Sequence, residues 1–286
     1  MNAPARPVLR YHGGKWVLAP WIIAHFPRHR CYIEPFGGAA SVLLRKPRAH
    51  QEVYGDLDGD VVNVFRVLRD PVQAEALRRA CELTPFARTE WEEACTPTED
   101  PVERARRAIV RSYFGHGSAS VNPEHCTGFR GRSMRNGTVA AVDWARWPAQ
   151  VPRYVERLRG VVIDHRDALA LIRQHDGADS LFYVDPPYPF ATRGRVRQCY
   201  RHELDEAGHR ALAQVLRQIS GLVVVSGYPC DLYDGELYPD WPRFSCVATA
   251  DGGRARREVL WLSPRTAEAL ERQQSLAFTT NHQETT

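Results

Sequence analysis

Residues 180–192 have the sequence SLFYVDPPYPFAT, an apolar run that ends in Asp185, two prolines and Tyr188. A short run of aliphatic, β-branched and aromatic residues predicts a buried strand. The prolines end that strand, because proline has no N–H to donate to a sheet ladder. A carboxylate at the end of a buried strand is costly unless it is paired. The stretch therefore predicts a strand that carries Asp185 to a functional edge of a sheet.

Four other runs of this kind predict further strands. They lie at 31–33, 52–54, 161–163 and 222–225. None alternates apolar and polar residues cleanly, which is typical of parallel strands covered on both faces. Helical patterns lie between them, at 58–68 and 205–219. This alternation predicts an α/β fold with a Rossmann-like, doubly wound and mainly parallel sheet.

The pattern changes in two places. Segments 244–248 and 258–262 flank the turn signal Asp251-Gly252-Gly253, which predicts a C-terminal antiparallel hairpin, followed by a short helix and a polar, frayed end. No strand is evident between 71 and 150, where a helical pattern at 101–113 precedes a stretch rich in Gly, Ser, Asn and Arg. We therefore predict a catalytic domain at 1–70 and 151–270, an inserted and mostly helical recognition region at 71–150, and a flexible tail at 271–286.

The composition is that of an ordinary globular protein. Of 286 residues, 43% are hydrophobic and 25% are charged. No apolar run approaches the roughly 20 residues that span a bilayer, and residues 1–9 lack a signal-peptide core, so we expect a cytoplasmic protein. The net charge of +4 permits a polyanionic partner without requiring one.

The seven cysteines are scattered, without a C-x-x-C pair or metal-ligand spacing, which favours reduced thiols and no metal site. Nearly all basic residues are arginines. The chain has only two lysines, Lys15 and Lys46.

A glycine-containing turn at 34–41 (EPFGGAAS) follows the first predicted strand. Glycines let the backbone approach a ligand, and the N–H groups of a helix start can bind it, although a plain tight turn also explains the pattern. Asp56 ends the second strand, about twenty residues on, where nucleotide-binding folds place a carboxylate for ribose hydroxyls. Asp56 or Asp58 could instead cap the next helix, and Asp58 suits that role better.

The opening stretch offers mainly hydrogen-bond acceptors. Asp185 would lie beyond the carboxyl end of its strand, where doubly wound sheets bind ligands. Pro186 and Pro187 supply carbonyl groups without N–H groups, and Tyr188 adds a flat face. Such a pocket suits an amino group on a planar ring. The alternative is a buried aspartate that satisfies a nearby loop.

Four segments together resemble the motifs of the Dam-like (alpha-group) adenine-specific DNA methyltransferases, which use S-adenosylmethionine. They are 10–15 (RYHGGK), 34–41, 54–58 (YGDLD) and 185–188 (DPPY), in the order of that group, with the 71–150 region before the last. Each is modest alone, whereas all four in order are specific, and the resemblance covers residues from about 7 to about 265. One departure is Ala40, which stands where the group often has the last glycine of its F-x-G-x-G motif.

The resemblance implies methyl transfer from S-adenosylmethionine to the exocyclic N6 amino group of a flipped adenine in duplex DNA. Asp185 and the Pro186 carbonyl would hold the amino hydrogens, with Pro187 completing the motif and Tyr188 stacked on the base. Lys15 would lie near the methionine carboxylate of the cofactor, although alone it could be a solvated residue. The implied cofactor-binding residues are Tyr11, Lys15, Glu34, Phe36, Gly37, Gly38, Ala39, Asp56, Leu57, Asp167 and Asp185. Asp167 could equally be a helix N-cap.

The inserted region would contact DNA through Asn122, Arg130, Arg132 and Arg135, because arginine binds guanine and phosphate and asparagine binds adenine. A solvated basic loop is the alternative. We expect a prokaryotic or phage enzyme, with or without a partner restriction enzyme, that acts as a monomer or as a dimer on DNA.

Other functions fit the residues less well. Enzymes that methylate glutamine amides have asparagine at the position of Asp185, and those that methylate the cytosine amino group usually have serine there. A non-catalytic DNA-binding protein would not need the intact tetrad and Lys15. A nicotinamide dehydrogenase would need the G-x-G-x-x-G spacing, which segment 36–41 lacks.

Overall fold

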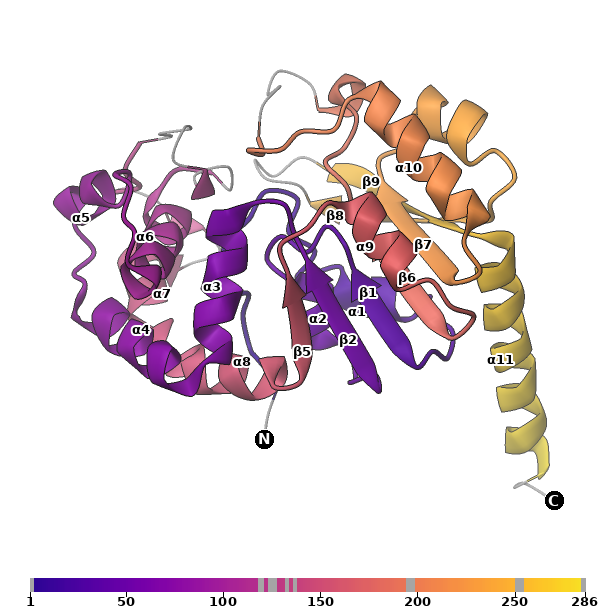
Figure 1. Ribbon diagram of the computed structural model, residues 1–286, viewed down its shortest axis with the longest axis horizontal. Helices are drawn as coiled ribbons and strands as arrows, with labels where there is room; N and C mark the ends of the chain where they lie inside the picture. Colours follow the sequence, from indigo (N-terminus) through magenta and orange to yellow (C-terminus); the bar gives the residue numbers. More distant parts are fainter. Residues whose placement is uncertain are drawn as a thin grey trace.

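The computed structural model describes residues 3–117, 121–122, 128–131, 134–135, 138–193, 199–249 and 255–283. Its main feature is a seven-stranded sheet with the order β5-β2-β1-β6-β7-β9-β8 (Figure 1). The strands are β1 (Cys31–Glu34), β2 (Gln51–Gly55), β5 (Val161–Asp164), β6 (Ser180–Val184), β7 (Leu222–Gly227), β8 (Arg243–Thr249) and β9 (Ala255–Leu262). The five strands from β5 to β7 are parallel, and β9 pairs antiparallel with both β7 and β8. The predicted Rossmann-like sheet and its C-terminal hairpin are confirmed.

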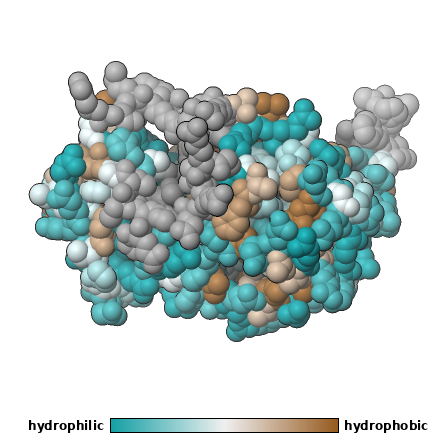
Figure 2. Space-filling model, turned by 90° about the horizontal axis from the view of Figure 1, so that it is seen from above, coloured by the Kyte–Doolittle hydropathy of each residue, from teal (hydrophilic) through white to brown (hydrophobic). Residues whose placement is uncertain are grey.

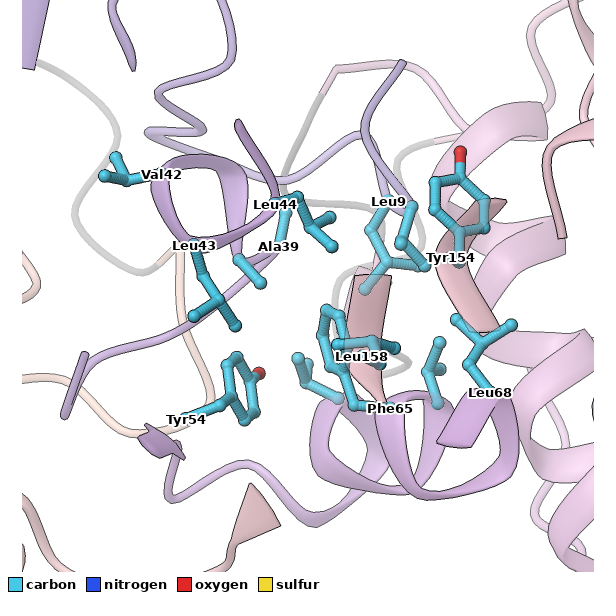
Figure 3. Packing of buried hydrophobic residues seen from close by; sticks show 14 of the residues in the cluster. Leu9, Ala39, Val42, Leu43, Leu44, Tyr54, Phe65, Leu68, Tyr154 and Leu158 are labelled. Atoms are coloured by element: carbon cyan, nitrogen blue, oxygen red, sulfur yellow. The ribbon is translucent and has the colours of Figure 1, made fainter. Parts of the chain in front are cut away.

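The sheet is covered on both faces, as its continuous apolar strands require. Alternate residues point to opposite sides, so Tyr183 lies in one buried cluster and Phe182 in the other. The cluster of Phe182 includes apolar side chains of α9 (Ala168–Gln174) and α10 (Glu206–Gln218), which lie in front of the sheet in Figure 1. The opposite face is covered by α1 (Ala19–Ile23), α2 (Ser41–Arg45) and α3 (Gly59–Arg69), and Figure 3 shows Leu43, Tyr54 and Phe65 meeting there.

The segment 71–150 gathers at one end of the sheet, beyond α3 (Figure 1). Its helices are α4 (Pro71–Leu83), α5 (Arg88–Glu93), α6 (Pro101–Phe114) and α7 (Ala140–Ala145), and α8 (Val151–Leu158) leads back into the sheet. The indole N–H of Trp147 donates to the Val8 carbonyl at 2.9 Å, which ties the end of the segment to the N-terminal part of the chain. The expectation of no strand here was wrong, because β3 (Met134–Arg135) pairs with β4 (Thr138–Val139) in a short ladder.

The chain after the sheet also differs from the prediction. The helix expected to be short, α11 (Pro264–Gln283), has 20 residues and continues through most of the segment that we assigned to a tail. It projects from the body at the end opposite to α4 and α5 (Figure 1). Its first turn is anchored because Thr266 Oγ1 accepts a hydrogen bond from the Val223 N–H at 2.7 Å.

Figure 2 shows a mostly hydrophilic face with small hydrophobic patches. Within the described part of the chain, no helix has the length and apolar character needed to cross a membrane.

The order of the parallel strands reverses between β1 and β6, and this topological switch point positions the site. β1 is flanked by β2 on one side and by β6 on the other, all parallel. The chain crosses from one half of the sheet to the other between these strands, so the loops after β1 and β6 diverge there. Doubly wound sheets bind ligands in this crevice, at the carboxyl ends of the strands.

Candidate active site

A cavity of about 330 Å³ lies at this switch point. Its volume is within the range of small-molecule sites. Five segments that are distant in sequence supply most of its wall: 11–15, the turn after β1, the residues after β2, 166–169 and 200–204. Asp185 and Pro187, after β6, also line it, whereas Pro186 and Tyr188 are buried beside it.

The turn after β1 needs glycine for two different reasons. A Cβ on Gly37 would lie 2.1 Å from Cε2 of Tyr54, so the backbone packs flat on that ring. Gly38 has a φ of +46°, and a Cβ there would lie 2.9 Å from Cε1 of Tyr11. The Tyr54 hydroxyl, on the neighbouring strand β2, donates to the Gly38 carbonyl at 2.8 Å and thereby holds the turn in place. The turn is therefore tight, and both glycines lie on the cavity wall.

Ala40, the residue that departs from the family motif, has a left-handed backbone with φ 52°. It is the N-cap of α2 and is fully buried. Left-handed backbone costs an L-residue with a Cβ roughly 1–2 kcal/mol, so alanine holds the glycine conformation at a penalty.

Asp56 and Asp58 have separate roles. Asp58 caps α3 and accepts from the Asp60 N–H at 2.9 Å, as predicted. Asp56 accepts from the N–H groups of Gly38 and Asp58, each at 2.8 Å, and lines the cavity. Burial raises the pKa of Asp56 to about 6, against the opposing effect of these hydrogen bonds. Leu57, between them, lines the cavity and is exposed.

The Asp185 carboxylate is held from two sides. Its Oδ1 accepts from Ser226 Oγ at 2.6 Å, and its Oδ2 lies 3.0 Å from Lys15 Nζ. Lys15 also donates to the Gly13 carbonyl at 2.7 Å. Burial lowers the pKa of Lys15, but the carboxylates of Asp185 and Glu258 outweigh that effect and raise it. The alternative of a solvated lysine is wrong, because the Lys15 side chain is 4% exposed.

Tyr188 is enclosed by Lys15 and by two side chains that were not predicted, Glu258 and Tyr228. Its hydroxyl donates to Glu258 Oε2 at 2.9 Å. The ammonium group of Lys15 lies 4.8 Å from its ring centroid, and the Tyr228 ring meets it edge to face at 4.7 Å. Glu258 and Tyr228 come from β9 and from the end of β7, so no spacing along the chain could connect them to the tetrad.

Two predicted cofactor residues have structural partners. Glu34 lines the cavity, but its Oε2 accepts from the Tyr32 hydroxyl at 2.9 Å and from the Leu43 N–H at 3.0 Å. Burial raises the pKa of Glu34 to about 8. Asp167 caps α9 through the N–H groups of Leu169 and Ala170, and it also lines the cavity. The remaining predicted residues, Tyr11, Phe36 and Ala39, lie on the cavity wall.

The segment 199–204, which the sequence analysis did not single out, closes one side of the cavity. The Tyr200 hydroxyl donates to the His12 carbonyl at 3.1 Å. Arg201 pairs with Asp58 at 3.3 Å and with Asp60 at 3.2 Å. Asp60 also pairs with Arg104 and Arg111 of α6, so the cavity wall is connected to the 71–150 region through one carboxylate.

The predicted DNA-binding residues are only partly described. Asn122 and Arg130 are buried, so neither a solvated loop nor an open DNA-contacting surface is seen at these two positions. Arg132 lies outside the described residues, and of Arg135 only the backbone, in β3, is described. Their contact with DNA stays a prediction. Among the described side chains, no group of three or more His, Cys, Asp or Glu residues could hold a metal ion.

This sheet, with its cavity at the switch point and its Asp-Pro-Pro-Tyr segment, is the architecture of a Rossmann-like methyltransferase. Residues 11–100 match the family model described as D12 class N6 adenine-specific DNA methyltransferase. A DNA adenine methylase of Serratia marcescens is 26% identical over 274 residues, which cover 89% of this chain and 92% of that protein. A DNA adenine methylase of Escherichia coli K12 is 27% identical over 117 residues, 39% of this chain and 41% of that protein. One from Vibrio cholerae is 35% identical over 69 residues, 24% of each chain.

The resemblance predicted from the motifs is confirmed by these comparisons: the chain is similar to the Dam-like adenine-specific DNA methyltransferases. The family model covers the first three motifs, except that it begins at Tyr11 within the first, whereas the tetrad at 185–188 lies beyond it.

Proposed function

We infer that this protein is a DNA adenine methyltransferase, which transfers a methyl group to the exocyclic N6 amino group of adenine in duplex DNA. The observation that carries this function is the position of Asp185. Its carboxylate lies at the wall of a ligand-sized cavity, beside prolines that offer carbonyl groups but no N–H groups. A base amino group, which donates two hydrogen bonds, is the natural partner of such acceptors.

The cavity fits S-adenosylmethionine as the donor. The glycine turn places backbone on the cavity wall, where a Cβ on Gly38 would strike the Tyr11 ring, and the carboxylate of Asp56 faces the cavity as a ribose acceptor. Tyr11, Phe36 and Ala39 supply a largely apolar surface for a purine ring. When bound there, S-adenosylmethionine supplies an electrophilic methyl group.

Asp185 and the Pro186 carbonyl have complementary tasks in this function. The lone pair of N6 is delocalised into the adenine ring, which makes the amino group a poor nucleophile. Two acceptors that each bind one amino hydrogen would hold the nitrogen in a tetrahedral geometry and direct its lone pair outward. Because Ser226 and Lys15 already fix Asp185, little reorganisation is needed when the base arrives.

Lys15 has a further part in this function. We predicted it near the methionine carboxylate of the cofactor, and its ammonium lies between Asp185 and the Tyr188 ring. From this position Lys15 would connect the cofactor to the target base. It donates a hydrogen bond to the Gly13 carbonyl on the cofactor side, and it pairs with Asp185 on the side of the base.

The target base must leave the duplex to reach this site, since its amino group is inaccessible within the stack. Tyr188 would contact the flipped ring. The 71–150 region, connected to the cavity through Asp60, would carry the recognition of the DNA through Asn122, Arg130, Arg132 and Arg135. We expect the enzyme to act as a monomer, or as a dimer on DNA, in the cytoplasm of a bacterial or phage-infected cell.

The test is transfer of radiolabel from S-adenosylmethionine to unmethylated duplex DNA, followed by hydrolysis and separation of the nucleosides. We expect label in N6-methyladenine. Label in a methylated cytosine, or in added protein instead of DNA, would contradict the function. Sequencing the methylated bases of DNA from cells that express this chain would then identify the target sequence.

A further inference from the structure

We propose that Glu258 is a positioning residue that holds the Tyr188 ring where the target base is accepted. This inference rests on the proposed function and names a residue outside all four motifs. Glu258 lies on β9, which joins the sheet antiparallel to β7 with Val259 opposite Gly227. The pairing therefore carries the side chain to the tetrad from a strand two positions along the sheet from β6.

The contact between Glu258 and Tyr188 is buried. Tyr188 donates to Glu258 Oε2 at 2.9 Å, and the two residues are 7% and 8% exposed. From residue 258 to 262, Glu258 is the one charged side chain in a buried stretch. A carboxylate in that position is costly unless it is paired and hydrogen-bonded. A ring that served only as an apolar wall would require neither the tyrosine hydroxyl nor this acceptor.

Lys15 explains how the carboxylate can be kept there. Glu258 and Asp185 both act on this one ammonium group and raise its pKa. The ammonium lies 3.0 Å from Asp185 Oδ2 and 4.8 Å from the ring centroid of Tyr188, whose hydroxyl is hydrogen-bonded to Glu258. Burial and Asp185 raise the pKa of Glu258, which Lys15 and the Tyr188 hydroxyl oppose. The arrangement is a buried network in which every member orients another.

β9 also holds the second ring of the site. Arg256 lies two residues before Glu258, on the same side of the strand, and its guanidinium carbon is 5.1 Å from the Tyr228 ring centroid. Arg256 donates to the Thr192 carbonyl at 2.9 Å, in the chain just after the tetrad. The Tyr228 ring contacts the Tyr188 ring edge to face. Strand β9 thus contacts both rings, and it also holds the chain that follows the tetrad at Thr192.

This geometry makes the hydrogen bond a determinant of ring orientation, separate from cofactor binding. Neither Glu258 nor Tyr188 lies on the wall of the cavity assigned to S-adenosylmethionine. Loss of the bond should therefore slow methyl transfer without changing cofactor affinity. A small displacement of a positioning group can slow a reaction by about 10²-fold.

The experiment measures single-turnover methyl transfer and the dissociation constant of S-adenosylmethionine for four proteins: wild type, Glu258→Ala, Tyr188→Phe and the double variant. We expect each single variant to be about 10- to 100-fold slower, with cofactor affinity within about threefold of wild type. In the Tyr188→Phe protein, Glu258→Ala should have little further effect, since the bond is already absent. Glu258→Gln, which keeps an acceptor oxygen, should restore most of the rate. The control is Arg257→Ala, because Arg257 is the exposed neighbour on the opposite side of β9.

Three results would overturn the inference: a wild-type rate for Glu258→Ala, an undiminished effect of Glu258→Ala in the Tyr188→Phe protein, or a wild-type rate for folded Tyr188→Phe. If Glu258→Ala does not fold, the rate of Tyr188→Phe tests the inference. Once the target is known, 2-aminopurine placed at the target adenine gives a direct signal of how the flipped base is stacked, and that signal should differ between wild type and both single variants. Failure of the proposed function is distinct, since then the wild-type protein itself would not methylate adenine.

Discussion

The two lysines of this protein occupy sites of nearly the same composition. Lys15 lies 3.0 Å from Asp185 and 4.8 Å from the Tyr188 ring centroid. Lys46 lies 2.9 Å from Glu52 and 4.5 Å from the Tyr32 ring centroid. Each site is therefore a buried ammonium group between a carboxylate and an aromatic ring.

The partners of the carboxylate distinguish the two sites. Glu52 also receives two hydrogen bonds from Arg157, at 2.6 and 2.9 Å, and it lies within the protein interior. Among the described residues, Asp185 has one cationic partner, Lys15, and it faces the cavity. Burial lowers the pKa of Lys46 despite Glu52, whereas the pKa of Lys15 is raised despite burial. A carboxylate saturated by two cations is structural, and one with acceptor capacity toward a cavity can act on a ligand.

The strongest test of this difference is Asp185→Ala. We expect turnover to fall by about 10²- to 10³-fold or more, because an acceptor for the reacting amino group is lost. Cofactor affinity should remain close to that of wild type. Steady-state kinetics with radiolabelled S-adenosylmethionine and equilibrium dialysis measure the two quantities. An Asp185→Ala protein that methylates at the wild-type rate would remove the chemical role from this site.

The matched substitution at the other site is Glu52→Ala. It leaves Lys46 and Arg157 buried without their shared carboxylate, so we expect the free energy of unfolding to fall by about 3–5 kcal/mol. The methylation rate per folded molecule should be unchanged. Urea denaturation and a rate normalised to bound cofactor check these two expectations. A stable Glu52→Ala protein with reduced turnover would reverse the distinction between the two lysine sites.

Glu34 lies between the two sites, since Asp185 raises its pKa and Lys46 lowers it. Its pKa is raised from 4.5 to about 8, mainly by burial, so the folded protein holds a proton that the unfolded chain loses. The stabilisation of the folded state by protonated Glu34 is complete below the pKa of this group in the unfolded chain, and it is lost as the pH rises through about 8. We expect unfolding free energy to decline by about 2–4 kcal/mol between about pH 5 and pH 9 through this group. Glu34→Gln should remove that part of the decline in denaturation curves measured across this range, and an unaltered pH profile would contradict it.

The smallest expected effect concerns α2, which connects the glycine turn at its N-cap to Lys46 at its C-cap. Ala39 and Ala40 are both buried, but only Ala40 has a positive φ among the described non-glycine residues. We therefore expect Ala39→Gly to reduce the unfolding free energy by about 1–2 kcal/mol more than Ala40→Gly does. Thermal and urea denaturation of the pair measure the difference. Equal losses would show that the left-handed backbone carries no penalty here.

Sequence reasoning succeeded where one short segment contains the whole signal. The five parallel strands, the hairpin and the Asp58 cap each depend on neighbouring residues and were predicted with their positions nearly correct.

Ser226, Glu258 and Arg201 were missed, because each reaches the site from another strand or loop and only the fold brings them to Asp185, Tyr188 and Asp60. Lys46 shows the same limit, since scarcity made both lysines notable but could not tell a structural ion pair from a site residue. The length of α11 was underestimated because its second half is polar and has no apolar repeat to mark it.

Asp60 should make the cavity wall respond to ionic strength. It is shared by three guanidinium groups, from Arg104, Arg111 and Arg201, at 2.6, 3.3 and 3.2 Å. Mobile ions screen exposed pairs far more than buried ones. Arg104, whose side chain is 40% exposed, should therefore loosen before Arg111, which is 5% exposed. Added salt would first release the outer arginine of α6, while the inner one keeps that helix attached to the residues around the cavity.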